Sequence, residues 1–270
     1  MRVKVAKHSG FCFGVRRAIR IAHATLSNSQ PDKKIYSLGP IIHNPQVVRE
    51  LERKGLRVAK DICEIRCGTV IISSHGAPKE VIEEIKRKRI ELIDATCPFV
   101  KYAHDIVKRL KKEGYRIIII GDKAHPEVKA LLSTAGPQDN RISKIGVVSQ
   151  TTQTKDKYIE GALRLLRAGF SEIRIFNSLC KDTLKRQLQA RRLLRSCDAM
   201  VVVGGKNSAN TRRLFEICKE SGVDSYHIED ENDLRQDYFI GKRCIGVISG
   251  ASTPDRTVKR VVKLLRQMKA

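Results

Sequence analysis

The chain has 270 residues, with 53 Lys or Arg against 29 Asp or Glu, which gives a net charge of +24. Hydrophobic residues make up 41% and charged residues 30%, a composition that excludes a disordered or collagen-like chain and allows more than one compact domain. The apolar runs are too short to span a bilayer, and the N-terminal residues lack a hydrophobic signal core. We therefore expect a cytoplasmic protein with no membrane partner.

The excess of basic residues has two interpretations. A strongly basic chain is typical of nucleic-acid-binding proteins, because neutralisation of phosphates dominates their affinity. It is also typical of a solvated surface rich in Lys and Arg. The chain has no Trp and only 5% aromatic residues, which leaves few side chains for stacking bases, and we expect no nucleic-acid partner.

Short β-branched runs alternate with amphipathic segments along the whole chain. This alternation predicts an α/β architecture with largely parallel sheets, and strands that are apolar throughout indicate sheets covered on both faces. The expected strands are residues 3–6, 34–38, 69–73, 90–93, 116–120, 144–149, 172–176, 199–203, 225–228 and 244–249. The clearest expected helices are residues 15–26, 100–112, 155–166, 184–194, 211–220 and 254–268.

Three cysteines occupy equivalent positions in this alternation and indicate a threefold repeat. Cys12 lies in GFCFGVRRAI, Cys97 in DATCPFVKYAH and Cys180 in NSLCKDTLKRQ, each after an expected strand and at the start of an expected helix. The intervals between them are nearly equal, which is typical of an internal repeat. The expected modules are residues 1–96 with Cys12, 97–179 with Cys97 and 180–270 with Cys180.

Each module also has two strands that end in polar loops. The first strand is followed by GPIIHNP, GDKAHPE or GGKNSAN, and the second ends in SSHG, SQTT or SGAS. In parallel sheets, ligands bind beyond the carboxyl ends of the strands. If the modules surround a pseudo-threefold axis, the thiols and loops converge on one cavity, into which the helix N-termini direct their partial positive charge.

Three thiols on a common axis suit either zinc or an iron–sulfur cluster. Structural zinc usually draws its cysteines in close CxxC pairs, whereas these three are unpaired in the sequence. A 4Fe–4S cluster ordinarily takes four cysteines, so a set of three would leave one iron open to a substrate oxygen.

The polar loops indicate the kind of substrate. They offer many donors and few fixed charges, which together with helix N-termini suit a small phosphate or diphosphate. Besides Asp122, Glu127 is the only carboxylate in these loop motifs, and a carboxyl group that faces the substrate is a natural proton donor. The candidate binding residues are His43, His75, His125, Thr151, Ser208, Asn210 and Ser252.

Distinctive motifs follow one another between residues 10 and 268: GFCFGV, GPIIHNP, SSHGAP, DATCPFV, HPEV, SQTT, GKNSAN and SGASTPD. In this order they resemble the 4-hydroxy-3-methylbut-2-enyl diphosphate reductase family. Members of that family catalyse the terminal reduction of the methylerythritol phosphate route to isoprenoid precursors.

The resemblance implies a trefoil of three pseudo-threefold-related α/β modules around a central 4Fe–4S cluster, with Cys12, Cys97 and Cys180 as its ligands. It also implies a reductive dehydroxylation of the allylic alcohol diphosphate, which consumes two electrons and two protons and yields isopentenyl and dimethylallyl diphosphates. The substrate hydroxyl is expected on the open iron. The residues that match the diphosphate site are His43, His75, Ser208, Asn210 and Ser252; those that match the group around the hydroxyl are His125, Thr151 and Glu127, the acid.

Two positions depart from the family pattern. Ala209 stands where the family usually has the second serine of a pair, so any contact there must come from the backbone. Asp182 lies in LCKDTLKRQ, where the family tends toward ICxAT followed by RQ, and it adds a carboxylate near the expected cluster. The residues of this motif that are kept are Cys180, Thr183, Arg186 and Gln187.

The remaining cysteines and histidines are expected to be structural. A free cysteine is often a small buried residue, and a lone histidine is usually a surface or capping residue. The cysteines expected to be buried are Cys197, Cys218 and Cys244, and the histidines are His8, His23, His104 and His227. Cys63 and Cys67, spaced CEIRC, could mimic a metal-binding pair, but no second pair is present and we expect them to be structural.

Two other functions stay open beside the reductase. A basic RNA-binding protein with a structural metal would explain the charge but not the threefold repeat. A non-redox iron–sulfur dehydratase or synthase of the quinolinate-synthase type would use the same open iron. For the reductase we expect a monomer or weak dimer whose basic surface attracts an acidic electron donor of the ferredoxin or flavodoxin type.

Overall fold

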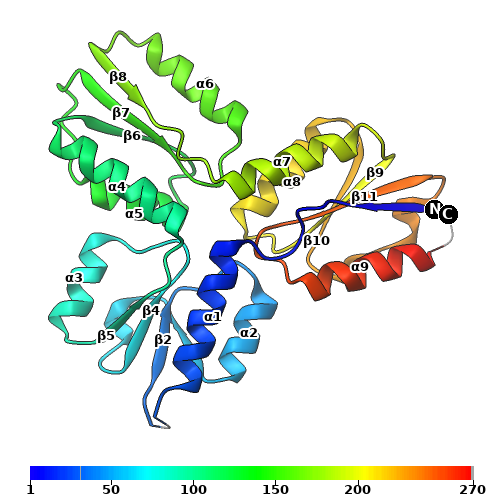
Figure 1. Cartoon of the computed structure of the whole chain (residues 1–270), viewed down its shortest axis with the longest axis horizontal. Coiled ribbons are helices and arrows are strands. Elements are labelled where there is room, and N and C mark those ends of the chain that lie inside the picture. The colour runs from blue at the N-terminus through cyan, green and yellow to red at the C-terminus, as the bar shows by residue number, and fades with distance from the viewer. Residues whose placement is uncertain (31, 269–270) are drawn as a thin grey trace. The chain divides into compact units, whose positions relative to one another are not determined.

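The computed structural model describes residues 1–30 and 32–268, which form eleven strands, nine α-helices and three short 3-10 helices. The strands of these residues pair in parallel in three separate sheets (Figure 1). The predicted α/β class with parallel sheets is therefore confirmed. Every expected strand is present, and the prediction missed only β3 (Leu56–Ala59).

One compact unit comprises residues 1–13, residues 43–47 and the described residues from Lys181 onward. It contains a single four-stranded sheet and three helices that lie wholly within it. The strands, in spatial order, are β1 (Arg2–Val5), β11 (Cys244–Ser249), β9 (Ala199–Val203) and β10 (Asp224–Ile228). The helices are α7 (Lys181–Leu194), α8 (Ala209–Glu220) and α9 (Asp255–Gln267), with the short η2 (Glu231–Asp233) and η3 (Gln236–Phe239) between β10 and β11.

The two central strands of this sheet are buried along their whole length because helices cover both faces. Met200 and Val202 of β9 pack in one apolar cluster with residues of α7 and α8. Val201 and Val203 face the other way and pack with α9. The unbroken apolar run in β9 thus follows from burial of both faces of a parallel sheet.

The N-terminal strand β1 completes this sheet. It pairs with β11, and Val3 lies opposite Ile245. The predicted first module, residues 1–96, contains this strand, whereas in the structure β1 belongs to the sheet of β9, β10 and β11. A short apolar run specifies a strand but not its partner, which explains the difference.

The second compact unit comprises residues 14–42 and 48–180 and contains two sheets. The first has the strands β5 (Glu91–Asp94), β4 (Thr69–Ile72), β2 (Ile35–Leu38) and β3. The second has the strands β8 (Glu172–Ile175), β7 (Lys144–Ser149) and β6 (Arg116–Ile120). Its helices are α1 (Phe13–Ser27), α2 (Pro45–Arg53), α3 (Lys79–Arg87), α4 (Pro98–Lys112), α5 (Pro126–Ala135), α6 (Lys155–Leu166) and the short η1 (Ile62–Glu64). The first residues of α1 and α2 fall in segments assigned to the first unit.

The three sheets share one strand order. Counted from one edge, each sheet has the strand that precedes a cysteine, then the strand that ends in a polar cluster, then the strand that ends in the glycine loop. These triplets are β1-β11-β9, β5-β4-β2 and β8-β7-β6. The shared order agrees with the threefold repeat predicted from the sequence. It places each cysteine beside the polar loops of a different predicted module, since Cys12 lies beside the loop after β11, Cys97 beside the loop after β4 and Cys180 beside the loop after β7.

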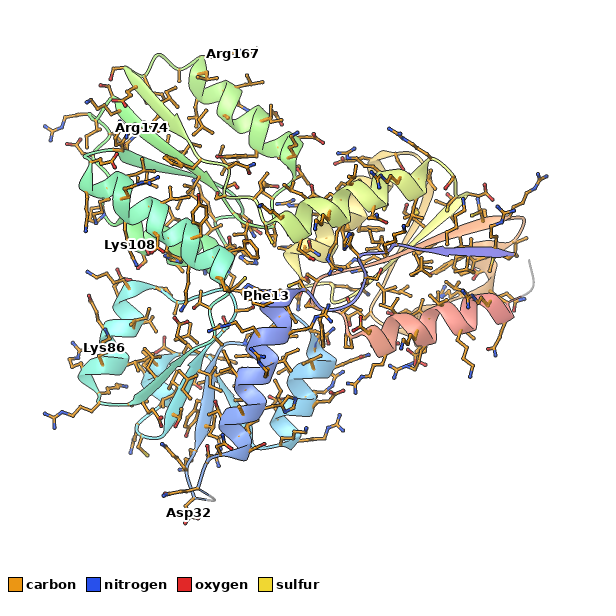
Figure 2. The ribbon with its side chains drawn as sticks, viewed as in Figure 1. Phe13, Asp32, Lys86, Lys108, Arg167 and Arg174 are labelled. Carbon is orange, nitrogen blue, oxygen red and sulfur yellow. The ribbon has the colours of Figure 1, made fainter. Side chains whose placement is uncertain are left out.

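The surface of the second unit carries much of the basic charge. Figure 2 shows Lys86, Lys108, Arg167 and Arg174 at its periphery, and all four are exposed. These cations therefore belong to a solvated surface. None of the helices formed by residues 1–30 and 32–268 combines the length and apolar character that crossing a membrane requires.

Candidate active site

The three cysteines predicted as ligands are held by the same backbone hydrogen bond. The N–H of each cysteine donates to a carbonyl in the loop that follows the neighbouring strand, and the acceptor is in each case the second residue after that strand. The bonds run from Cys12 to Ala251 (3.0 Å), from Cys97 to Ser74 (3.0 Å) and from Cys180 to Thr151 (2.9 Å). The sequence repeat is thus also a repeat of contacts.

The chemistry of these thiols fits an iron–sulfur cluster. Cys12, Cys97 and Cys180 are half-buried and form no disulfide, and each directly precedes the first residue of a helix, α1, α4 or α7. Cysteine sulfurs are the usual ligands of iron–sulfur clusters. The donor set present is therefore one that a cluster could use.

The other cysteines differ in their surroundings. Cys197, Cys218 and Cys244 are buried in the core of the first unit, as predicted, and the Sγ atoms of Cys197 and Cys244 lie 3.4 Å apart. Burial raises the pKa of the Cys218 thiol to about 12, so this thiol stays protonated. Cys63 and Cys67 are exposed.

Four of the predicted site residues meet in the second unit. His125 is the N-cap of α5, and its Nδ1 accepts the backbone N–H of Glu127 at 3.2 Å, which places the proton of the neutral ring on Nε2. The ring of His75 packs edge to face on that of His125, with 5.4 Å between the ring centroids. Glu127 in turn accepts hydrogen bonds from Thr151, through Oε1 from the backbone N–H (2.6 Å) and through Oε2 from the hydroxyl (2.8 Å).

The Glu127 side chain is the buried acid of this group. The residue is only 1% exposed, and burial raises the pKa of its carboxyl to about 7, although both hydrogen bonds from Thr151 favour the carboxylate. A carboxyl group with this pKa holds a proton near neutral pH and can release it. The environment of Glu127 therefore suits a general acid.

The remaining predicted residues lie in the first unit. The Ser252 hydroxyl donates to the carbonyl of His43 at 3.0 Å. A Cβ atom on Gly205 would lie 2.9 Å from the same carbonyl, so only glycine lets the loop after β9 approach His43 so closely. Cys12 is adjacent to this group, because its N–H bonds to Ala251, the neighbour of Ser252.

Ser208 and Asn210 lie at the start of α8. Ser208 is the N-cap, and its Oγ accepts the N–H of Thr211 at 3.4 Å. Asn210 is 4% exposed, and within the described parts of the chain neither its Oδ1 nor its Nδ2 has a hydrogen-bond partner. Burial of an amide group without hydrogen-bond partners costs folding free energy. The Asn210 amide is therefore suited to form hydrogen bonds with the polar atoms of a bound ligand. Ala209, between the two, presents only its backbone to such a ligand.

The structure explains the second departure from the family pattern. The carboxylate of Asp182 lies 2.7 Å from Nε of Arg186, one helical turn further along α7. Sequence reasoning kept Arg186 as a motif residue but gave it no role, although the i,i+4 spacing of an acidic and a basic residue is a recognisable signal on a helix.

Two histidines outside the site also have defined contacts. His104 was predicted to be a surface or capping residue, and this prediction is wrong. It is half-buried between helices, with Nδ1 2.7 Å from Oγ1 of Thr134. Burial lowers the pKa of His104 to about 4, so its ring is neutral at physiological pH. His227 is a half-buried residue of β10, and its Nε2 lies 2.9 Å from the carbonyl of Gly204.

The fold and the site together define a class of protein. It is an α/β protein with three parallel sheets, in which a cysteine and two polar loops lie at the carboxyl ends of each sheet's strands, and one module adds a buried acid. The chain belongs to the LytB protein family, whose family model matches residues 3–266.

Close relatives share one enzyme name. The 4-hydroxy-3-methylbut-2-enyl diphosphate reductase of Geobacter metallireducens is 43% identical over 280 residues, which cover 99% of this chain and 98% of the relative. The reductase of the same name from Pelobacter propionicus is 44% identical over 274 residues, with coverage of 97% and 96%.

Solved structures agree with these relatives. A structure of (E)-4-hydroxy-3-methyl-but-2-enyl diphosphate reductase, described as the terminal enzyme of the non-mevalonate pathway, matches with a TM-score of 0.70 and 38% identity and covers 99% of this chain and 100% of that one. The corresponding reductase from Plasmodium falciparum matches with a TM-score of 0.91 and 29% identity over 98% of this chain and 87% of that one.

Proposed function

We propose that this chain is a 4-hydroxy-3-methylbut-2-enyl diphosphate reductase. The observation that carries the proposal is the identical backbone hydrogen bond on Cys12, Cys97 and Cys180, each at a helix N-terminus beside a polar loop. Membership of the LytB family and the shared name of its relatives support the same function. The two alternatives, a quinolinate-synthase-type enzyme and an RNA-binding metal protein, are not favoured by these relatives.

The cofactor in this proposal is one 4Fe–4S cluster ligated by Cys12, Cys97 and Cys180. When bound, it would pass electrons from a donor to the substrate and offer an open coordination position on one iron. The protein's part is to fix the three thiols at the helix N-termini through their backbone N–H groups.

The proposed diphosphate site combines neutral donors with helix N-termini. Ser208 and Asn210 lie at the start of α8, where backbone N–H groups face an anion. Burial and the nearby Arg212 lower the pKa of His43, so this ring acts as a neutral hydrogen-bonding group. The full set proposed for the diphosphate is His43, His75, Ser208, Asn210 and Ser252.

The proposed proton donor is Glu127. The reaction breaks the allylic C–O bond and forms a C–H bond, and it consumes two electrons and two protons. One proton leaves with the hydroxyl as water, and the other enters the new C–H bond. A protonated Glu127 can supply a proton near the hydroxyl, and Thr151 then stabilises the carboxylate through two hydrogen bonds. His125 completes this group and orients Glu127 through its backbone.

The electrons are proposed to come from a small acidic carrier of the ferredoxin or flavodoxin type. The net charge of +24 supports this partner, because opposite charge accelerates association at low ionic strength. The monomer or weak dimer, and the location in the cytoplasm, stay predictions from the sequence.

The first experiment is strictly anaerobic purification followed by iron, acid-labile sulfide and zinc analysis on one sample. About four irons and four sulfides per chain are expected for one cubane cluster. Addition of the allylic diphosphate with a chemical reductant should then yield isopentenyl and dimethylallyl diphosphates. Zinc without sulfide, reproducible after attempted cluster reconstitution, would overturn the proposal.

A further inference from the structure

Arg186 is a buried cation of the first unit, and all three of its guanidinium nitrogens have hydrogen-bond partners. It is 2% exposed, and its Nε lies 2.7 Å from the carboxylate of Asp182. The other guanidinium nitrogens donate to backbone carbonyls, Nη1 to His8 (3.2 Å) and Ser249 (3.1 Å) and Nη2 to Gly10 (2.9 Å).

Two of these carbonyls lie in the loop that leads from β1 to Cys12, and the third ends β11. Gly10 is tied a second time, because its N–H donates to Oγ of Ser249 at 2.7 Å. Gly10 has a φ of +81°, and a Cβ there would overlap the carboxylate of Asp255, so the loop follows a path open only to glycine. Arg186 thus fixes the backbone two residues before Cys12.

Only arginine can make this set of contacts. A planar guanidinium presents several donors in fixed directions, whereas a lysine ammonium is a single point charge on a flexible stem. A buried cation also needs a compensating carboxylate. Asp182 provides it and leaves the remaining donors of Arg186 directed at the loop.

A related contact occurs in the second unit. Nη1 of Arg17, on α1, donates at 3.1 Å to the carbonyl of Thr96, the residue before Cys97. An arginine from a helix therefore supports the segment before a cysteine in both units, and Arg186 does so with two carbonyls of that segment instead of one.

We propose that Arg186 is a positioning residue for the Cys12 thiol and that Asp182 holds the Arg186 guanidinium in the required orientation. This inference rests on the proposed function, in which Cys12 is a ligand. It assigns a role to Asp182, one of the two residues that depart from the family pattern.

The first test measures the Cys12 thiol directly. The cluster-free full chain is alkylated with iodoacetamide, and the labelling rates of Cys12, Cys97 and Cys180 are followed separately by peptide mass spectrometry. Arg186→Lys should raise the rate at Cys12 about tenfold relative to Cys97, because the loop opens more often. Asp182→Ala should act in the same direction with a smaller effect. The matched control is Arg192→Lys, an exposed arginine on the same helix, which should change nothing.

The second test uses the cluster-loaded chain. Arg186→Lys should release iron to a chelator about tenfold faster and alter the electron paramagnetic resonance spectrum of the reduced cluster, because ligand geometry tunes the iron. An unchanged Cys12 labelling rate would overturn the proposal, as would an equal increase at all three cysteines, which indicates general loss of stability. If wild-type protein holds no iron, the proposed function fails, but the labelling experiment still decides the role of Arg186.

Discussion

Glu127 receives two hydrogen bonds from a single residue, Thr151, whose backbone N–H and hydroxyl lie 2.6 and 2.8 Å from the two carboxylate oxygens. The carbonyl of Thr151 accepts the N–H of Cys180. One residue therefore supports both the buried acid and one of the thiols. A substitution that removes the Thr151 hydroxyl affects only the contact with Glu127, because Cys180 bonds to the Thr151 backbone. The support of the acid and the support of the thiol can therefore be separated by experiment.

Glu127→Gln should slow turnover by about 10²-fold or more while the iron and sulfide content stays at the wild-type level. Glutamine keeps the shape of the side chain but carries no acidic proton. Steady-state turnover of the allylic diphosphate, normalised to iron, measures the effect. A variant with full activity would show that Glu127 is not the proton donor.

The rate should depend on pH through the same carboxyl. The pKa of Glu127 is raised to about 7, so its acid form is lost above that pH and kcat should fall about tenfold per pH unit. Thr151→Val removes the hydroxyl donor that favours the carboxylate, and the falling limb of the profile should move to higher pH. A profile that does not move in this variant would argue against Glu127 as the titrating group.

The buried carboxyl should also make folding stability depend on pH. Between its ordinary pKa of 4.5 and the folded value of about 7, Glu127 binds more protons in the folded state than in the unfolded state. Its protonation therefore stabilises the fold fully below about pH 4.5, and this contribution is lost as the pH rises through 7. The Tm of wild type relative to Glu127→Gln should fall between pH 5 and pH 8. A constant difference would contradict the assigned pKa.

Serine substitutions should divide the cysteines into two groups. Cys12→Ser, Cys97→Ser and Cys180→Ser should each lose iron, because an alcohol does not replace a thiolate ligand. Cys218→Ser is the control, since this thiol is buried in the core and its pKa is raised to about 12. Iron per folded chain is the measurement, and retention of a full cluster in any of the first three variants would remove that residue from the ligand set.

Ala209→Ser should strengthen substrate binding. Ala209 is the first residue of α8, between Ser208 and Asn210, and a serine there would add a hydroxyl donor for the diphosphate. We expect KM to fall about threefold to tenfold, the effect of one additional hydrogen bond to a charged group, with kcat nearly unchanged. An increase in KM would show that the added hydroxyl clashes with the bound diphosphate.

Local patterns in the sequence predicted most of the fold. β-branched runs such as that of β9 identify buried strands, and equivalent placement of Cys12, Cys97 and Cys180 identifies the repeat. The prediction missed β3, because four residues with the exposed Arg57 in the middle carry little periodicity.

Long-range relationships could not be predicted in this way. The pairing of β1 with β11 joins strands from opposite ends of the chain, and a local pattern contains no information on that partner. The near-complete burial of Glu127 and the contacts of Arg186 depend likewise on segments far apart in sequence. The residue types were recognisable, but their burial and partners required the structure.

The pairing of β1 with β11 has a consequence for the order of folding. During synthesis β1 emerges more than 200 residues before its partner β11. The second unit ends at Cys180, and all strands of its two sheets precede that residue, so this unit can fold early, with the backbone contacts of Cys97 and Cys180 in place. The Cys12 N–H gains its acceptor only when the loop after β11 arrives, so the thiol nearest the start of the chain is the last of the three to be fixed.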